Sequence, residues 1–289
     1  MGGANVINAT YAAVLRTGGA AGTAWHQRDN GLLYVPPSII TRSPPSAVGL
    51  TTRYAQREGL VIRSFEIHNR SGSTISVGIG GRIHNRHWIA GTLTSDNVTF
   101  TDRTAGYQSQ TATIFGADAA VNDGVCILSR VKFDWVSANI TTAEVDAGAA
   151  VDHTISYSTG ATWTALGANA DTVPAGVGNF VTSNAVWTAV ATNLAMFSPA
   201  DWTVTAGLGG VPNGYYGILF TSAQMGAGDT AALVTGVEIG NMLIAEGVVD
   251  NGTWEQEQVD YWMPNVDGLV AYFSTANAGN RVYCETQTR

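Results

Sequence analysis

The chain is poor in charged residues, and lysine is almost absent. Only 12% of its 289 residues are charged while 45% are hydrophobic, and Lys132 is the single lysine. Free globular proteins normally carry more surface charge, because charge keeps them apart in solution. A polar surface made mostly of Ser, Thr, Asn and Gln suits β-sheets and surfaces that neighbouring molecules cover. The composition therefore favours a β-rich protein that assembles with others.

Cysteines and long apolar runs are scarce as well. Cys126 and Cys284 are the only cysteines, too few for a disulfide framework or a zinc site, so we expect buried free thiols. No apolar stretch approaches about 18 residues, which predicts no membrane span. Residues 1–5 lack a basic segment followed by an apolar run, which predicts no signal peptide.

The few charges are unevenly distributed. Residues 1–103 hold ten arginines against five acids, whereas residues 104–289 hold four cations against seventeen acids. Arginine makes planar, bidentate contacts and tolerates partial burial better than lysine, so the first third is predicted to be a contact surface. Genome composition explains the low lysine content equally well. The net charge of −8 and the lack of basic clusters predict no direct binding of nucleic acid.

Residues 1–58 differ from the rest of the chain. The proline pairs Pro36-Pro37 and Pro44-Pro45 force extended backbone and exclude helix locally. Arginines accompany this proline region. We therefore expect an extended N-terminal arm over 1–58, and the alternative is an ordinary first strand with an irregular lead-in.

From residue 60 onward the hydrophobic pattern has a period of two. Apolar residues alternate over 60–67 and 75–79, and the polar, glycine-containing segment 69–73 between them predicts a β-hairpin. Similar short runs follow, separated by turn clusters, and no 15-residue window has a helical stripe. Short, regularly spaced strands of this kind indicate a sandwich or jelly roll.

The predicted fold is therefore all-β, with one or more β-sandwich or jelly-roll-like domains and the N-terminal arm. We expect a first β-rich domain or sheet over 59–150 and a β-sandwich domain over 151–289. The latter ends in a predicted hairpin formed by residues 268–274 and 281–285.

Motifs for catalysis, cofactors or metals are not recognised. His84 and His87 would point to opposite faces of a strand, and neither has a neighbouring cysteine or acid at a ligand-like spacing. The densest acidic stretch, residues 255–260, reads as a solvated strand edge. An enzyme acting on carbohydrate would need a carboxylate pair in a cleft, which no spacing identifies. We therefore expect a non-enzyme without catalytic, cofactor-binding or metal-binding residues.

Large aromatic side chains occur near predicted strand ends. At such positions each ring can bury about 150–250 Å² and close a sandwich core. A row of exposed rings that stacks on sugars is the alternative interpretation. The predicted core aromatics are Tyr157, Trp163, Trp187, Trp202 and Tyr216.

Residues 155–239 contain several spaced motifs of aromatic residues and glycines. The segment ISYSTGATWTAL (155–166) is similar to the strand–turn–strand pattern YW-x-G-x-x-W-x-x-L of virion proteins of tailed bacteriophages. After Val186-Trp187, SPADW (198–202) is similar to W-x-x-P-x-D-W, and PNGYYGILF (212–220) is similar to NG-x-x-G-Y-W-I-R-F. The order of the elements matches, while Tyr216 replaces a common Trp and Leu219 a common Arg. The resemblance implies a β-sandwich.

The resemblance also implies a function. We expect a virion structural protein, specifically a capsid decoration or cement protein on the head of a tailed double-stranded DNA phage, made in the host cytoplasm. Its expected partners are the major capsid protein and further copies of the chain, as a homotrimer. A tail or head-fibre module that binds host-surface glycans through exposed aromatics is the alternative. The candidate capsid contacts are Arg42, Arg53, Arg57, Arg82 and Arg86.

Overall fold

The fold is built almost entirely from β-strands. The computed structural model describes residues 10–16, 26–27, 32–35, 60–94, 99–108, 113–115, 124–142, 153–165, 186–188, 199–222, 232–256, 259–273 and 280–288. Within these ranges the helical elements are the single turn η1 (Asn85–His87) and the short helix α2 (Thr104–Gln108). The all-β prediction is confirmed. No helix of the described residues is long and apolar enough to span a membrane.

The chain forms two compact units that are not contiguous in sequence. Unit 1 consists of residues 1–84 and 240–289, and unit 2 consists of residues 85–239, which are inserted between the two parts of unit 1. Strand β15 (Ala232–Val248) begins in unit 2 and ends in unit 1. This grouping differs from the contiguous segments expected from the sequence, because the strands that complete unit 1 come from both ends of the chain.

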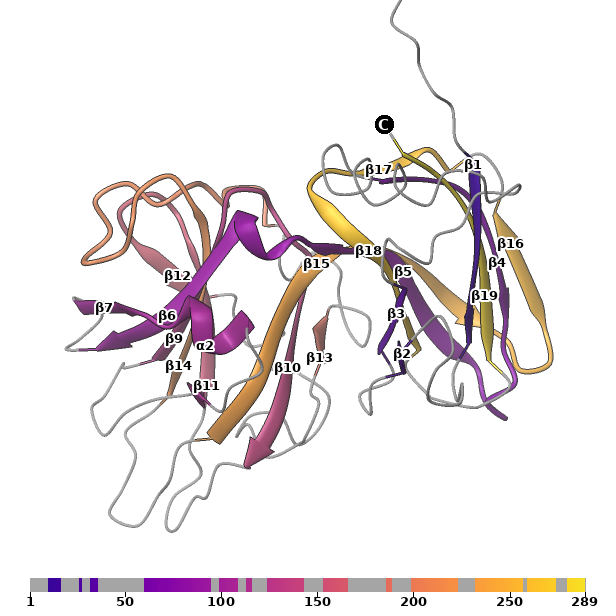
Figure 1. Ribbon diagram of the computed structural model, residues 1–289, viewed down its shortest axis with the longest axis horizontal. Coiled ribbons are helices and arrows are strands. Elements are labelled where there is room, and N and C mark those ends of the chain that lie inside the picture. Colours follow the sequence, from indigo (N-terminus) through magenta and orange to yellow (C-terminus); the bar gives the residue numbers. More distant parts are fainter. Residues whose placement is uncertain are drawn as a thin grey trace, which may run out of the picture. The chain divides into compact units, whose positions relative to one another are not determined.

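Unit 1 is a β-sandwich of two antiparallel sheets (Figure 1). One sheet has the order β1-β19-β4-β16, and β17 also pairs with β4. The other contains β15, β5, β18, β3 and β2 in this order. Besides β15, the strands are β1 (Thr10–Arg16), β2 (His26–Gln27), β3 (Leu32–Val35), β4 (Leu60–His68), β5 (Ile75–Ile83), β16 (Thr253–Gln256), β17 (Tyr261–Met263), β18 (Val266–Phe273) and β19 (Arg281–Thr288).

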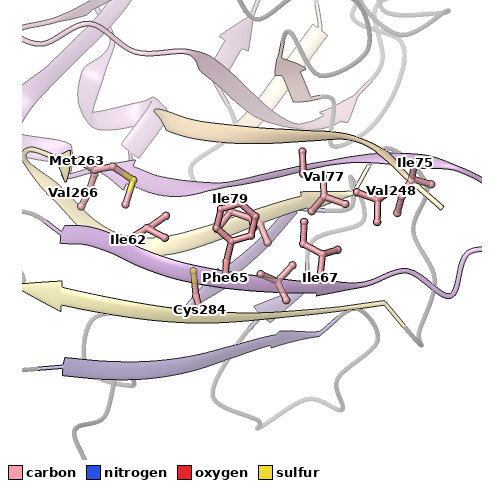
Figure 2. Close-up of a cluster of buried hydrophobic side chains, with 13 residues drawn as sticks. Ile62, Phe65, Ile67, Ile75, Val77, Ile79, Val248, Met263, Val266 and Cys284 are labelled. Atoms are coloured by element: carbon pink, nitrogen blue, oxygen red, sulfur yellow. The ribbon is translucent and has the colours of Figure 1, made fainter. Parts of the chain in front are cut away.

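The two sheets of unit 1 share one apolar core. Alternate residues of β4 and β5 point into it, as Figure 2 shows for Phe65, Ile67 and Ile79. Phe65 also stacks on Trp254, with ring centroids 5.4 Å apart. Removing such a side chain from water stabilises the fold by about 1.5–3 kcal/mol. The buried members of this core are Ile62, Phe65, Ile67, Ile75, Val77, Ile79, Ala245, Val248, Met263, Val266, Ala271, Val282 and Cys284.

Two predicted hairpins are wrong. Strands β4 and β5 flank the turn at 69–73 but belong to different sheets, as do β18 and β19. Each pair faces across the core instead of sharing a ladder of hydrogen bonds. A period of two identifies the apolar face of a strand but not its neighbour, and a short turn can also cross the roughly 10 Å between packed sheets.

A buried asparagine closes the turn between β4 and β5. The side-chain amide of Asn69 donates to the carbonyl oxygens of Ser73 (2.7 Å) and Val248 (2.8 Å). Its side-chain oxygen accepts from the backbone amide (2.9 Å) and hydroxyl (2.7 Å) of Ser71. Asn69 is fully buried, so these four bonds satisfy a side chain that has lost its contact with water.

Parts of the expected N-terminal arm are sheet strands. Strand β1 pairs with β19 over seven residues, and β3 pairs with β18. Extended backbone was predicted here, and these segments belong to the two sheets of the sandwich: β1 lies at the edge of one sheet, and β3 lies between β18 and β2 in the other. The proline pairs and Arg42, Arg53 and Arg57 lie outside the described residues.

Unit 2 is centred on a six-stranded antiparallel sheet with the order β12-β11-β14-β9-β6-β7. Both faces of the sheet are covered at the central strand β9, because all six of its residues are buried. Strands β13 and β10 pair next to the first half of β15, which also pairs with β8. The strands of unit 2 are β6 (Trp88–Thr94), β7 (Thr99–Asp102), β8 (Thr113–Phe115), β9 (Gly124–Ser129), β10 (Trp135–Thr142), β11 (His153–Ser158), β12 (Trp163–Ala165), β13 (Val186–Thr188) and β14 (Tyr216–Ser222).

Candidate functional site

The histidines and cysteines singled out from the sequence do not form a reactive centre. Within the described ranges, no three His, Cys, Asp or Glu side chains gather to hold a metal ion. The Nε of Arg86 donates to the Nε2 of His87 at 2.9 Å. Cys126 and Cys284 are buried free thiols, as expected. Burial raises the pKa of Cys284 to about 12 and raises that of Cys126 further still.

Three of the segments that carry the phage resemblance meet in unit 2. The hydroxyl of Tyr157 in β11 donates to Asp201 Oδ1 at 2.9 Å. The hydroxyl of Ser158 donates to the carbonyl of Thr203 at 2.7 Å and accepts from the backbone amide of Gly217 at 3.0 Å. The β11–β12 hairpin, the segment after residue 199 and β14 are therefore tied together at one place.

The turn before β14 is held by a second set of hydrogen bonds. The backbone amide of Thr205 donates to the carbonyl of Tyr215 at 2.8 Å, and that of Gly214 donates to the carbonyl of Thr205 at 2.8 Å. The side-chain oxygen of Asn213 accepts from the backbone amide of Gly207 at 2.8 Å. Gly214 has φ +84°, a conformation that glycine adopts at little cost, so the Asn-Gly pair forms the turn that the sequence indicates.

Trp202 lies where the β11–β12 hairpin, the segment after residue 199 and β14 meet, a place here called the junction. Only 2% of its surface is exposed. Its ring makes edge contacts with Phe133 (centroids 5.2 Å apart, 74°) and Tyr216 (5.6 Å, 76°). Among the described residues its indole nitrogen has no hydrogen-bond partner. Such rings prefer edge-to-face packing, and each pair contributes about 0.5–1.5 kcal/mol beyond burial.

The other predicted core aromatics have different environments. Tyr157 is buried, with 7% exposure, whereas Trp163 and Tyr216 are half-buried. The Trp163 ring covers Gly217, where an added Cβ would be 2.8 Å from the ring. Trp187 belongs to β13, outside the six-stranded sheet, and its side chain is not among those described.

Burial of these rings bears on the glycan alternative. A sugar stacks on an aromatic face that solvent can reach, and the face of Trp202 lies inside unit 2. Trp202 therefore acts as a packing residue.

Burial, followed by the hydrogen bond to Asp201 and the negative charge of that carboxylate, raises the pKa of Tyr157.

Two cations lie over the aromatic rings at the edge of this junction. The guanidinium of Arg130 is 5.5 Å from the centroid of Tyr215. The ammonium of Lys132 is 5.5 Å from the centroid of Tyr216 and 6.0 Å from that of Trp202. No sequence pattern predicted this arrangement. A signal was present, since two of the four cations of residues 104–289 are two positions apart.

The described arginines of the predicted capsid contact lie in different units. Arg82 is half-buried near the end of β5 in unit 1, and Arg86 is exposed in η1 of unit 2. In register, Arg82 is opposite Gly240 on one side and Gly268 on the other. The exposed position of Arg86 suits contact with a partner better than that of Arg82.

Comparisons of the chain with models of known protein families, with curated proteins and with solved structures found no match. The resemblance of residues 155–239 to tailed-phage virion proteins therefore rests on the motif residues themselves.

Proposed function

We propose that this chain is a non-enzymatic structural protein of a tailed-phage virion, a capsid decoration protein that binds the major capsid protein and further copies of itself. The observation that carries the proposal is the junction at Trp202. Segments that match the virion pattern at 155–166, 198–202 and 212–220 are separated in sequence but are joined by hydrogen bonds.

The composition and the fold support this proposal physically. A chain with 12% charged residues has extensive uncharged polar surface that can be covered by neighbours without a large desolvation cost. Two units with their own cores resist deformation, because packed interiors are dense and compress little. Such a module stabilises a shell mechanically, by bridging subunits. A specific contact of this kind buries about 1,000 Å² or more.

Arg86 is the most accessible described member of the proposed capsid contact. It is exposed, and the Nε contact with His87 orients its guanidinium. Arginine in such a position can form bidentate hydrogen bonds with carboxylates of an acidic shell protein. On this proposal the protein is located on the outer surface of the head.

Fractionation of particles tests the proposal. Purified heads and tails would be analysed separately, and the amount of this chain relative to the major capsid protein would be measured by quantitative mass spectrometry. We expect the chain in heads at a fixed ratio to the shell protein. Finding the chain in tails alone would contradict the proposed decoration role.

A further inference from the structure

The turn between β9 and β10 presents two ordered cations. Arg130 is exposed and Lys132 is half-buried, and each is held against a half-buried tyrosine, Tyr215 or Tyr216. A cation over an aromatic ring is attracted by about 0.5–1 kcal/mol at an exposed site. These four residues, here called the cationic surface, therefore combine fixed positive charge with aromatic area.

The chemistry of the cationic surface is that of a protein contact. Arginine and tyrosine are enriched among the residues that contribute most to binding at interfaces. Side chains that are already ordered lose less conformational entropy when a partner docks. Because residues 104–289 hold seventeen acids against four cations, this positive surface is an exception within an acidic region.

An acidic counterpart occurs in unit 1. Glu66 of β4 and Glu255 of β16 are directly opposite each other in the antiparallel register. Phe65 and Ile67 point into the core, so Glu66 points to the outer face of the sheet, where its side chain is 38% exposed and contacts His68. Glu255 is exposed. Like charges directly opposite on neighbouring strands destabilise a sheet, and a cation from a partner would relieve the repulsion.

We propose that the cationic surface of one copy binds the acidic pair Glu66 and Glu255 of a second copy. The inference deepens the self-association that forms part of the proposed function, and it names the surfaces involved. Because the two surfaces differ, the contact is heterologous, and repetition of such a contact closes into a ring when the rotation allows. A trimeric ring is the simplest assembly that agrees with the expected homotrimer.

Charge reversal tests the contact on the full chain. The association constant would be measured by sedimentation velocity for the wild type, for R130E/K132E, for E66R/E255R and for the variant that carries all four changes. We expect each one-sided reversal to weaken association by about thirtyfold or more, and the fourfold variant to regain it. The control R70E/R103E changes the net charge by the same amount as R130E/K132E at two other exposed arginines and is expected to associate like the wild type.

Thermal melting verifies that each variant is folded, and the neutral pairs R130Q/K132Q and E66Q/E255Q replace any reversal that is not. A monomeric wild type, one-sided variants that associate normally, a fourfold variant that stays dissociated, or an equally weakened control would each overturn the contact. The result is separable from the capsid role. A chain found in heads but monomeric in solution overturns only the contact, and one that associates but is absent from heads overturns only the decoration role.

Discussion

At the scale of single residues, buried polar groups determine how unit 1 turns from one sheet to the other. Asn69 makes four hydrogen bonds with its side chain and has no exposure to solvent. Removing one partner of a buried hydrogen bond leaves the other unsatisfied, which costs more than the bond itself contributes. The Asn69 side chain is therefore expected to be a main stabiliser of this turn.

Asn69→Ala is expected to lower the free energy of unfolding by about 2–3 kcal/mol, because the buried carbonyl of Val248 loses its donor and the bonds to Ser71 and Ser73 are lost as well. Urea denaturation followed by tryptophan fluorescence measures the change. Thr74→Ala, in the same turn but exposed, is the matched control and should stay within about 0.5 kcal/mol of the wild type. Equal effects at both positions would contradict the role assigned to Asn69.

Trp202 permits a second residue-scale prediction. Trp202→Ala should destabilise the chain by about 3–5 kcal/mol through the cavity it leaves. Trp202→Phe should cost only about 1 kcal/mol, since it keeps an aromatic ring against Phe133 and Tyr216 and removes a buried N–H that has no acceptor among the described residues.

Trp262→Ala provides the control for Trp202, because Trp262 is 39% exposed. Its replacement should change the free energy of unfolding by about 0.5 kcal/mol or less. If Trp202→Ala were as mild as Trp262→Ala, Trp202 could not be the centre of the junction.

At the scale of elements, glycines set how closely β5 and β15 approach. A Cβ added at Gly80 would overlap the backbone oxygen of Asn241 in β15. One added at Gly78 would meet the side chain of Met242, which is flexible and can move. A glycine-to-alanine substitution therefore clashes with fixed backbone at position 80, but only with a flexible side chain at position 78.

Gly80→Ala is accordingly expected to lower the midpoint of urea unfolding more than Gly78→Ala, with costs of about 3 and 1 kcal/mol. Both variants add one methyl group to the same strand, so propensity and burial are matched. Equal midpoints for the two variants would show that the backbone contact with Asn241 does not limit the pairing.

The strands of unit 1 could be predicted from the sequence, but their pairing into sheets could not. The alternation in residues 60–67 and 75–79 predicts both strands and their buried faces, because a period of two is a local property. The assignment of β4 and β5 to different sheets depends on partners from 232–248 and 281–288, which no local pattern reveals.

The junction at Trp202 could be predicted in part from the sequence. The Asn213-Gly214 turn and the apolar strands are legible from the sequence. The contacts of Arg130 and Lys132 with tyrosines about 85 residues away are tertiary, so only the spacing of the two cations hinted at them.

At the scale of the whole molecule, each unit contains one buried thiol. Cys284 lies in unit 1 and Cys126 in unit 2. Burial raises the pKa of both thiols, so the reactive thiolate is scarce at neutral pH and increases only when the pH rises towards the raised pKa or when the unit opens.

At pH 8, neither cysteine of the native protein should therefore react with a thiol reagent. In urea, both cysteines should react. Variants that retain only Cys126 or only Cys284 would report the opening of unit 2 and unit 1 separately. We expect two different urea midpoints, since each unit has its own core. Coincident midpoints would contradict independent opening.

The most direct measurement of the proposed decoration role compares particles assembled with and without this chain. Negative-stain images and the temperature at which heads release their DNA would be recorded for both. The account predicts that heads without the chain lack surface density, release DNA at a lower temperature and regain both properties when purified protein is added back. Heads that are identical in appearance and heat resistance with and without the chain would contradict it.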